Sequence, residues 1–149
     1  MSTAKQDLVR HWMAAFQQAT PARPPAIIDP DLADFRYDLV NEEASETNRA
    51  DDHIEQLDGI ADLLYVVYGW AVSIGFTTEQ VDAAFAEVHR SNMSKLWTAE
   101  EIESLPPDCR ATRVDDERFV VKRSDGKVIK SPSYSPANLR PILELNPPA

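Results

Sequence analysis

Six carboxylates between residues 41 and 69 form two groups with helical spacing. They are Glu42, Glu43 and Glu46, followed by Glu55, Asp58 and Asp62. Residues three and four apart share one face of an α-helix, so each group predicts a local acidic patch. Two such patches facing each other without basic residues would offer oxygen ligands to a hard divalent cation, Mg²⁺ or Mn²⁺. The alternative is a solvated acidic face on an acidic protein.

A second group of polar residues lies near Met93. It comprises His89, Arg90, Asn92 and Lys95, of which Asn92 and Lys95 are three residues apart and share a helix face. Because a cation and an amide together can bind phosphate and its neighbouring groups, Asn92, Lys95 and Arg90 are candidate substrate ligands. For Lys95 the alternative is a solvated cation that complements the helix dipole, and for His89 it is a surface or packing role.

Hydrophobic periodicity predicts four helices that position these groups, over residues 3–18, 31–48, 52–74 and 78–96. Prolines between 21 and 30 separate the first two helices, and Gly75 is placed to end the third. Each helix carries an apolar stripe, and the connections between the last three are short. We therefore expect an all-α fold, an antiparallel four-helix bundle with a small C-terminal β-hairpin and tail.

The apolar stripes relate the carboxylates to the predicted core. In the second helix, Leu32, Phe35 and Leu39 fall on the same stripe as Glu43 and Glu46, so the acids continue the apolar face. The first helix has a predicted core stripe of Leu8, Trp12, Ala15 and Phe16. The third has an apolar face of Leu57, Ile60, Ala61, Leu64 and Val67, bordered by Asp58, Asp62 and Tyr65.

From Trp97 onward the chain changes character. Residues 98–117 are polar and predict a mobile loop with at most one helical turn near 99–104. The segments RFVVKR and KVIKS flank Ser-Asp-Gly, which predicts a β-hairpin, and a short helix is expected over 136–143. We expect one domain over residues 1–149, with a helical core over about 3–96 and the loop, hairpin and tail over 97–149.

Composition limits the possible functions. The chain of 149 residues with 43% apolar residues suits one modest core. A net charge of −10 argues against a broad nucleic-acid-binding surface. No uninterrupted apolar run of about 18 residues and no signal-type start appear, so we expect a cytoplasmic protein without membrane partners. Cys109 is the single cysteine, which excludes an internal disulfide.

Three motifs resemble a known family. The segment EEASE, Glu42 to Glu46, followed by GIAD, Gly59 to Asp62, and an apolar run resembles the all-α nucleoside triphosphate pyrophosphohydrolases, the MazG-like and dimeric dUTPase-like group. The segments 87–95 and 125–143 resemble its phosphoribosyl-ATP pyrophosphohydrolase-like subgroup of bacteria and phages. One position departs from the family pattern: Gly59 stands where the family has Glu, and Asp58 is the neighbouring candidate to replace it.

The resemblance implies hydrolysis of a (deoxy)nucleoside triphosphate to the monophosphate and pyrophosphate. It implies that Mg²⁺, with Mn²⁺ as a substitute, is held by Glu43, Glu46, Asp58 and Asp62. Glu42 is then the candidate general base beside Glu43. Asn92 and Lys95 would face the nucleotide, and an aromatic such as Phe16 or Trp12, with Tyr65, would border the base.

The resemblance also implies a homodimer or a dimer of dimers. On this expectation Val66, Trp70 and Ile74, on the far side of the third helix, pack against their symmetry mates. The substitution at Gly59 motivates an alternative function, a catalytically impaired module that binds a nucleotide or metal without turnover. A purely structural helical protein is the third possibility.

Overall fold

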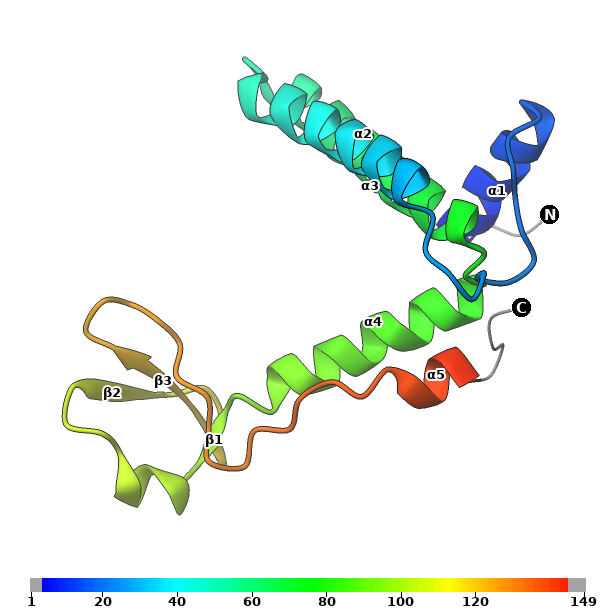
Figure 1. The fold of residues 1–149 in the computed structure, drawn as a ribbon. Helices are drawn as coiled ribbons and strands as arrows, with labels where there is room; N and C mark the ends of the chain where they lie inside the picture. The colour runs from blue at the N-terminus through cyan, green and yellow to red at the C-terminus, as the bar shows by residue number, and fades with distance from the viewer. Residues whose placement is uncertain (1–3, 145–149) are drawn as a thin grey trace. The chain divides into compact units, whose positions relative to one another are not determined.

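The computed structural model describes residues 4–144 and is mostly helical, with four long helices and a small antiparallel sheet (Figure 1). The elements are α1 Lys5–Ala15, α2 Pro30–Arg49, α3 His53–Ile74, α4 Thr78–Met93, β1 Trp97–Thr98, the 3₁₀ turn η1 Glu101–Ser104, β2 Cys109–Arg113, β3 Arg118–Arg123 and α5 Arg140–Glu144. The four long helices lie within a few residues of the predicted ranges. The described residues form two compact units, one comprising residues 4–81 with 143–144, the other Asp82–Ile142.

Local hydrogen bonds set the ends of the helices that carry the acids. Asp29 caps α2 by accepting from the backbone N–H of Asp31 at 3.0 Å. Asp52 caps α3 by accepting from the N–H groups of Ile54 and Glu55 at 2.8 and 2.9 Å. At its other end α3 stops at Gly75, whose φ of 97° lies in the left-handed region that glycine tolerates. The predicted end at Gly75 is confirmed.

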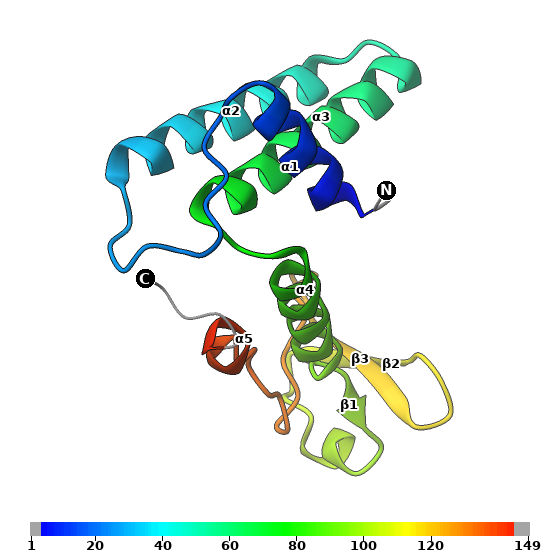
Figure 2. The ribbon, with the colours of Figure 1, turned by 90° about the vertical axis from the view of Figure 1, so that its right-hand side faces the viewer.

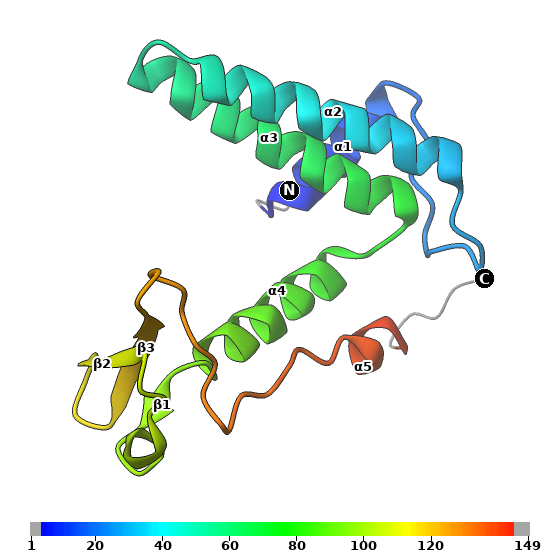
Figure 3. The same cartoon turned by 60° about the vertical axis from the view of Figure 1, so that its left-hand side comes forward.

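Within the first unit, α2 and α3 form an antiparallel helical hairpin, side by side in Figures 1 and 3. Helix α1 packs on α3 (Figure 2), where Val9 and Met13 meet Val72 in a small core with Tyr68 against it. Because most of α4 belongs to the second unit, the four-helix bundle stays a prediction.

The predicted core stripe of α1 was wrong. Leu8, Trp12 and Phe16 are 47%, 39% and 65% exposed, whereas the residues buried on α1 are Gln6, Val9 and Met13. Ala15 is exposed as well. The helix therefore turns an adjacent face toward α3. The reason is that Gln6 donates from Nε2 to the Phe76 carbonyl at 2.8 Å, which ties that face to the end of α3.

Helix α3 leaves most of its apolar surface exposed. The predicted apolar face is present, but Leu57, Ile60, Leu64 and Val67 are all exposed, and the buried residues of α3 are Gly69, Val72 and Ser73. By length and composition alone, α3 is the one helix in the described part of the chain that suits a membrane span, although Asp58 and Asp62 interrupt its apolar sequence. A core helix passes the same test, so this surface indicates that α3 needs cover.

The second unit contains a three-stranded antiparallel sheet in the order β1-β3-β2. Its core is Trp97, Cys109 and Val121, with Phe119 among the residues packed against it. The expected mobile loop over 98–117 was wrong, because β2 lies inside it and pairs with β3 from Cys109↔Arg123 to Arg113↔Phe119. The turn η1 falls where one helical turn was expected.

The predicted hairpin is present in outline. The turn at Gly126 exists, with φ 85°, and the segment after it returns along β3. The N–H groups of Arg123 and Ile129 donate to the carbonyls of Lys127 and Val121, both at 2.9 Å, although this segment forms only the isolated bridge Lys122↔Val128 and no further strand. The strand β3 gains its main partner from β2 instead, because β2 alternates its buried and exposed residues against the same core.

The tail 131–139 runs alongside α4 (Figure 3). Ser135 and Asn138 donate their backbone N–H groups to Ser94 Oγ at 3.0 Å and Glu87 Oε1 at 2.9 Å. Because these N–H groups are used on α4, the predicted helix from Pro136 starts only at Arg140.

Candidate active site

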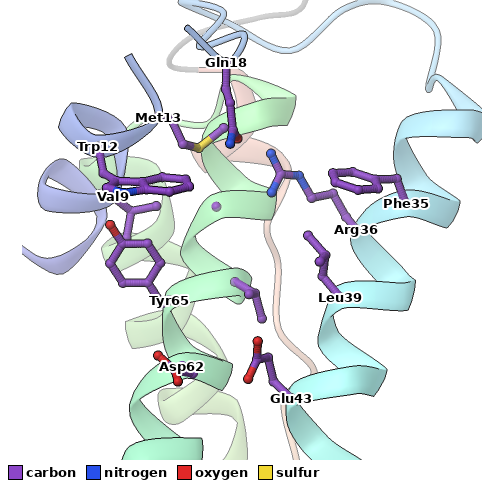
Figure 4. A pocket seen from close by; sticks show the side chains of 12 residues that line it. Val9, Trp12, Met13, Gln18, Phe35, Arg36, Leu39, Glu43, Asp62 and Tyr65 are labelled. Atoms are coloured by element: carbon purple, nitrogen blue, oxygen red, sulfur yellow. The ribbon is translucent and has the colours of Figure 1, made fainter. Parts of the chain in front are cut away.

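A cavity of about 320 Å³ opens between α1, α2 and α3 (Figure 4). Its walls are mainly apolar and aromatic, with Trp12 and Met13 from α1 and Tyr65 from α3. Glu43 from α2 and Asp62 from α3 lie together at one end in Figure 4. Volumes of roughly 300–1,000 Å³ with few polar groups are typical of small-ligand pockets. The predicted acidic continuation of the α2 stripe is thus part of a cavity wall.

A second cavity of similar volume, about 320 Å³, lies farther along the same hairpin. Glu46 lines it from α2, and Asp58 and Asp62 line it from α3, with Arg49 at its border. Asp62 contributes to both cavities. The four carboxylates predicted to hold metal therefore lie along one continuous seam between α2 and α3.

The raised pKa of Glu43 reflects the closeness of these carboxylates. Burial raises the pKa of Glu43, and the charges of Asp62, Glu46, Glu42 and Asp58 raise it further, in that order. Each ion pair found among residues 4–144 lies in the second unit, so no base neutralises this group by a direct pair. Like charges held together in this way favour a proton or a cation.

The carboxylates do not form a closed set of metal ligands as they stand. Across residues 4–144, no three His, Cys, Asp or Glu side chains are grouped closely enough to hold a metal ion. Glu55, the remaining acid of the second group, is used by the helix cap, since its Oε2 accepts from the Asp51 N–H at 2.9 Å. Glu42 is exposed on α2 beside Glu43.

Gly59 allows α2 and α3 to approach closely. A Cβ at this position would lie 2.5 Å from Thr47 Oγ1 and 3.0 Å from Thr47 Cα. Because backbone lies behind the hydroxyl, a Glu side chain at 59 requires the helices to separate. The glycine in place of the family Glu therefore matches the close packing of α2 on α3. Asp58 is the neighbouring carboxylate that lines the seam.

The aromatic residues predicted near the base divide into two roles. Trp12 and Tyr65 line the first cavity, with ring centroids 5.9 Å apart in an edge-to-face arrangement. Phe16 lies outside that lining and stacks on Trp12, with centroids 4.6 Å apart. Phe16 thus supports the orientation of the Trp12 ring.

The predicted phosphate ligands lie in the second unit. Lys95 Nζ donates to Asn92 Oδ1 at 2.7 Å, so the two side chains share a face as expected. Arg90 is occupied differently: it forms a bidentate pair with Glu87 at 2.7 and 2.8 Å and donates to the Pro136 carbonyl at 3.2 Å. Within one chain Arg90 holds the tail, while Asn92 and Lys95 remain candidate ligands.

Sequence reasoning missed Arg36. Its side chain is 7% exposed and lines the first cavity, and its Nε donates to Ser73 Oγ at 3.0 Å. The signal was present, because Arg36 lies four residues after Leu32 and seven before Glu43, on the predicted stripe. A single cation within an apolar stripe is a buried polar group that needs a partner.

Comparison with models of protein families gives a match. The family model of phosphoribosyl-ATP pyrophosphohydrolase matches residues 9–92, a range that includes α2, α3, both cavities and Asn92. No curated protein matches the chain. The match spans more than half of the sequence and covers the whole carboxylate seam. The chain therefore belongs to the phosphoribosyl-ATP pyrophosphohydrolase family, enzymes that hydrolyse a phosphoanhydride bond of a nucleotide.

Proposed function

We propose that this protein hydrolyses a (deoxy)nucleoside triphosphate to the monophosphate and pyrophosphate in a metal-dependent reaction that adjusts the nucleotide pool. One observation supports this most directly: four carboxylates line a seam between α2 and α3 next to an aromatic cavity. The seam suits a cation with phosphate bound to it, and the cavity suits the nucleoside. The family match supports the class of reaction.

The chemistry of the donors fits a hard cation. Glu43, Glu46, Asp58 and Asp62 supply only carboxylate oxygens, which Mg²⁺ and Mn²⁺ prefer, and the raised pKa of Glu43 reflects charge that a cation would neutralise. When bound, Mg²⁺ supplies charge neutralisation of the phosphates and a more acidic water. We assign the ligand role to these four residues.

The chain's own residues supply the remaining roles. Glu42, exposed on α2 beside the seam, is the candidate base that accepts a proton from the attacking water, with Glu43 next to it. Trp12 and Tyr65 hold the base by stacking and edge contacts. Asn92 and Lys95, which contact each other, are assigned to the sugar and the phosphates on the basis of the family resemblance.

We also propose that two copies of the chain associate through α3, as a homodimer or a dimer of dimers. Exposed side chains along α3 include Leu57, Ile60 and Leu64. Of the residues predicted for this interface, Val66 lines the first cavity instead, so the interface is displaced toward the exposed side chains. A symmetric partner would bury this face and bring a second copy of Asn92 and Lys95 into the assembly.

The test is pyrophosphate release from the common nucleoside triphosphates and phosphoribosyl-ATP, with Mg²⁺. We expect Glu43→Ala and Glu46→Ala to reduce turnover by at least about 100-fold, since even outer-shell changes around metals cost 10- to 100-fold. Asp34→Ala, an exposed acid on the same helix, is the control and keeps full activity. Unchanged helicity in circular dichroism excludes unfolding. Full turnover of Glu43→Ala in excess EDTA would refute the proposal.

A second candidate function is a binding module with impaired turnover. The close approach of Gly59 to Thr47 supports it, because the ligand that the family carries at this position is missing and has no room. Calorimetry separates the two functions. Tight binding of a triphosphate with Mg²⁺, without product over hours, would favour the module, whereas release of pyrophosphate would favour the enzyme.

A further inference from the structure

Arg36 is the one strongly buried cation beside the aromatic cavity. Its side chain is 7% exposed, and burial lowers its pKa without a nearby carboxylate contributing to the shift. An arginine keeps its charge in proteins. The first cavity therefore contains a buried guanidinium whose charge no acidic side chain of the described residues neutralises by an ion pair.

Two direct contacts, one of them supported by a further hydrogen bond, fix the orientation of this guanidinium. Its Nε donates to Ser73 Oγ at 3.0 Å, and Ser73 is held in turn by donating to the Trp70 carbonyl at 2.9 Å. The Phe35 ring lies 5.4 Å from the guanidinium carbon. These contacts use the Nε and one face of the group, while its outer end points from α2 toward the middle of the cavity in Figure 4.

Gly69 provides the space that this end occupies. A Cβ at position 69 would lie 3.3 Å from Arg36 Nη1, and the residue is buried. No hydrogen bond from Nη1 or Nη2 to another described residue accompanies the Nε contact. The pair of N–H donors at the outer end is therefore free to bind a ligand.

The cavity has two chemically different ends. Arg36 and Glu43 are seven residues apart on α2, and Gly69 and Asp62 are seven apart on α3, which corresponds to about 10.5 Å along each helix. The cation thus lies at one end of the cavity and the carboxylates at the other (Figure 4). If the metal and phosphates occupy the carboxylate end, the nucleobase reaches Arg36.

We propose that Arg36 determines which base is accepted, by donating two hydrogen bonds to a base with two adjacent acceptor atoms. This inference rests on the proposed function for the placement of the phosphates. Guanine offers O6 and N7, and cytosine offers O2 and N3. Adenine places an amino donor beside N7, and uracil and thymine separate their carbonyls by an N–H. The preferred substrates are therefore guanine or cytosine nucleotides.

The experiment measures binding of dGMP, dCMP, dAMP and dUMP by calorimetry with Mg²⁺, which offsets the repulsion between the phosphate and the carboxylates. These monophosphates have no phosphoanhydride bond, so no turnover interferes. We expect dGMP or dCMP to bind at least about tenfold more tightly than dAMP and dUMP, the discrimination typical of one bidentate arginine contact. The better of the two identifies the base. Equal binding of all four would overturn the proposal, as would equally tight binding of deoxyribose 5-phosphate.

Variants assign the preference to this residue. Arg36→Lys keeps the charge but loses the fork of donors, so it should remove the preference while binding of dAMP changes little. Arg140→Lys, exposed on α5 and outside the linings of both cavities, is the matched control and keeps the preference. An equal loss of affinity for all four bases in Arg36→Lys would instead indicate a phosphate or packing role and refute the assignment.

Ser73→Ala and Gly69→Ala provide a second route if Arg36→Lys fails to fold. Both keep Arg36, but the first removes the acceptor of its Nε and the second displaces its Nη1. We expect each to reduce the preference several-fold, and an unchanged preference in both would contradict the proposal. Selective binding without any hydrolysis would refute the proposed function alone and leave the role of Arg36 in place.

Discussion

The two units cover their apolar and polar groups to different extents. In the second unit Trp97 and Val121 are 4% and 0% exposed in a core closed by the small sheet. In the first unit the longest helix, α3, exposes most of its apolar side chains. The small sheet thus completes a core within one chain, whereas most of the apolar surface of α3 stays exposed.

The same contrast holds for polar groups. In the second unit the buried Ser131 donates to the Ser94 carbonyl at 2.8 Å. In the first unit the buried Gln6 Oε1 is without a hydrogen-bond partner among the described residues, and Arg36 is buried without a counter-ion. Incomplete satisfaction concentrated in one region is typical of functional sites. The difference is consistent with the proposal that the metal and the base bind to the first unit.

The largest expected effect compares two tryptophans. Trp97 is buried and donates from Nε1 to the Ile129 carbonyl at 3.0 Å, whereas Trp12 is 39% exposed at the cavity. Trp97→Ala should cost about 3–5 kcal/mol of unfolding free energy, and Trp12→Ala only about 1 kcal/mol. Urea denaturation followed by NMR signals of β3 and α1 measures both.

Nucleotide binding should show the opposite order. Trp12→Ala removes a wall of the cavity and should weaken binding, while Trp97→Ala at temperatures where it stays folded should affect binding less. Equal unfolding costs for the two substitutions would contradict the contrast between the closed core around Trp97 and the open cavity at Trp12.

The second prediction concerns the close contact of α2 and α3. Gly59→Ala places a methyl group 2.5 Å from Thr47 Oγ1, and overpacking of this kind costs about 1–3 kcal/mol, more than the roughly 1 kcal/mol gained from helix propensity. Gly59→Glu should lower the melting temperature further instead of restoring a family ligand. Thr47→Ala in the Gly59→Ala background is the control and should recover part of the loss. A more stable Gly59→Glu protein would disprove the packing argument.

The third prediction uses the raised pKa of Glu43. A carboxyl group whose pKa is raised on folding contributes stability that is fully present below the unfolded pKa, about 4.3, and is lost as the pH rises through the folded value. In EDTA, the melting temperature should therefore rise as the pH is lowered from neutral toward the unfolded pKa. Glu43→Gln should flatten this dependence. The opposite result would be a wild-type melting temperature that falls as the pH is lowered, while that of Glu43→Gln does not. It would show that folding does not raise the pKa of Glu43 and that the inferred repulsion is absent.

The smallest expected effect has the opposite sign and lies in the second unit. Hydrogen bonds from Arg90 and from the Asn138 N–H lower the pKa of Glu87 to about 2. Its contribution is present above the unfolded pKa of about 4.3 and is lost as the pH falls toward about 2. The protection factor of the Asn138 amide, which is its exchange rate corrected for the intrinsic pH dependence, should fall over that interval. In Glu87→Gln the exchange should lack this step, and an identical step in the variant would exclude Glu87 as its cause.

The sequence by itself determined the features that depend on neighbouring residues. Helix ends follow from short-range caps such as Asp52 and Gly75, so the four long helices were predicted within a few residues. The grouping of the acids on α2 and α3 follows from helical spacing, and a family motif can be recognised in the same residues. These features need no information about distant contacts.

Only the tertiary structure decided which faces meet. The exposure of Trp12, the burial of Arg36 and the contact of Gly59 with Thr47 depend on how three helices rotate against one another. The pairing of β2 with β3 depends on residues far from the turn that was predicted to organise the sheet. Spacing along a helix defines its faces. Which face is buried depends on the free energy of packing against a partner, which is a property of the whole fold.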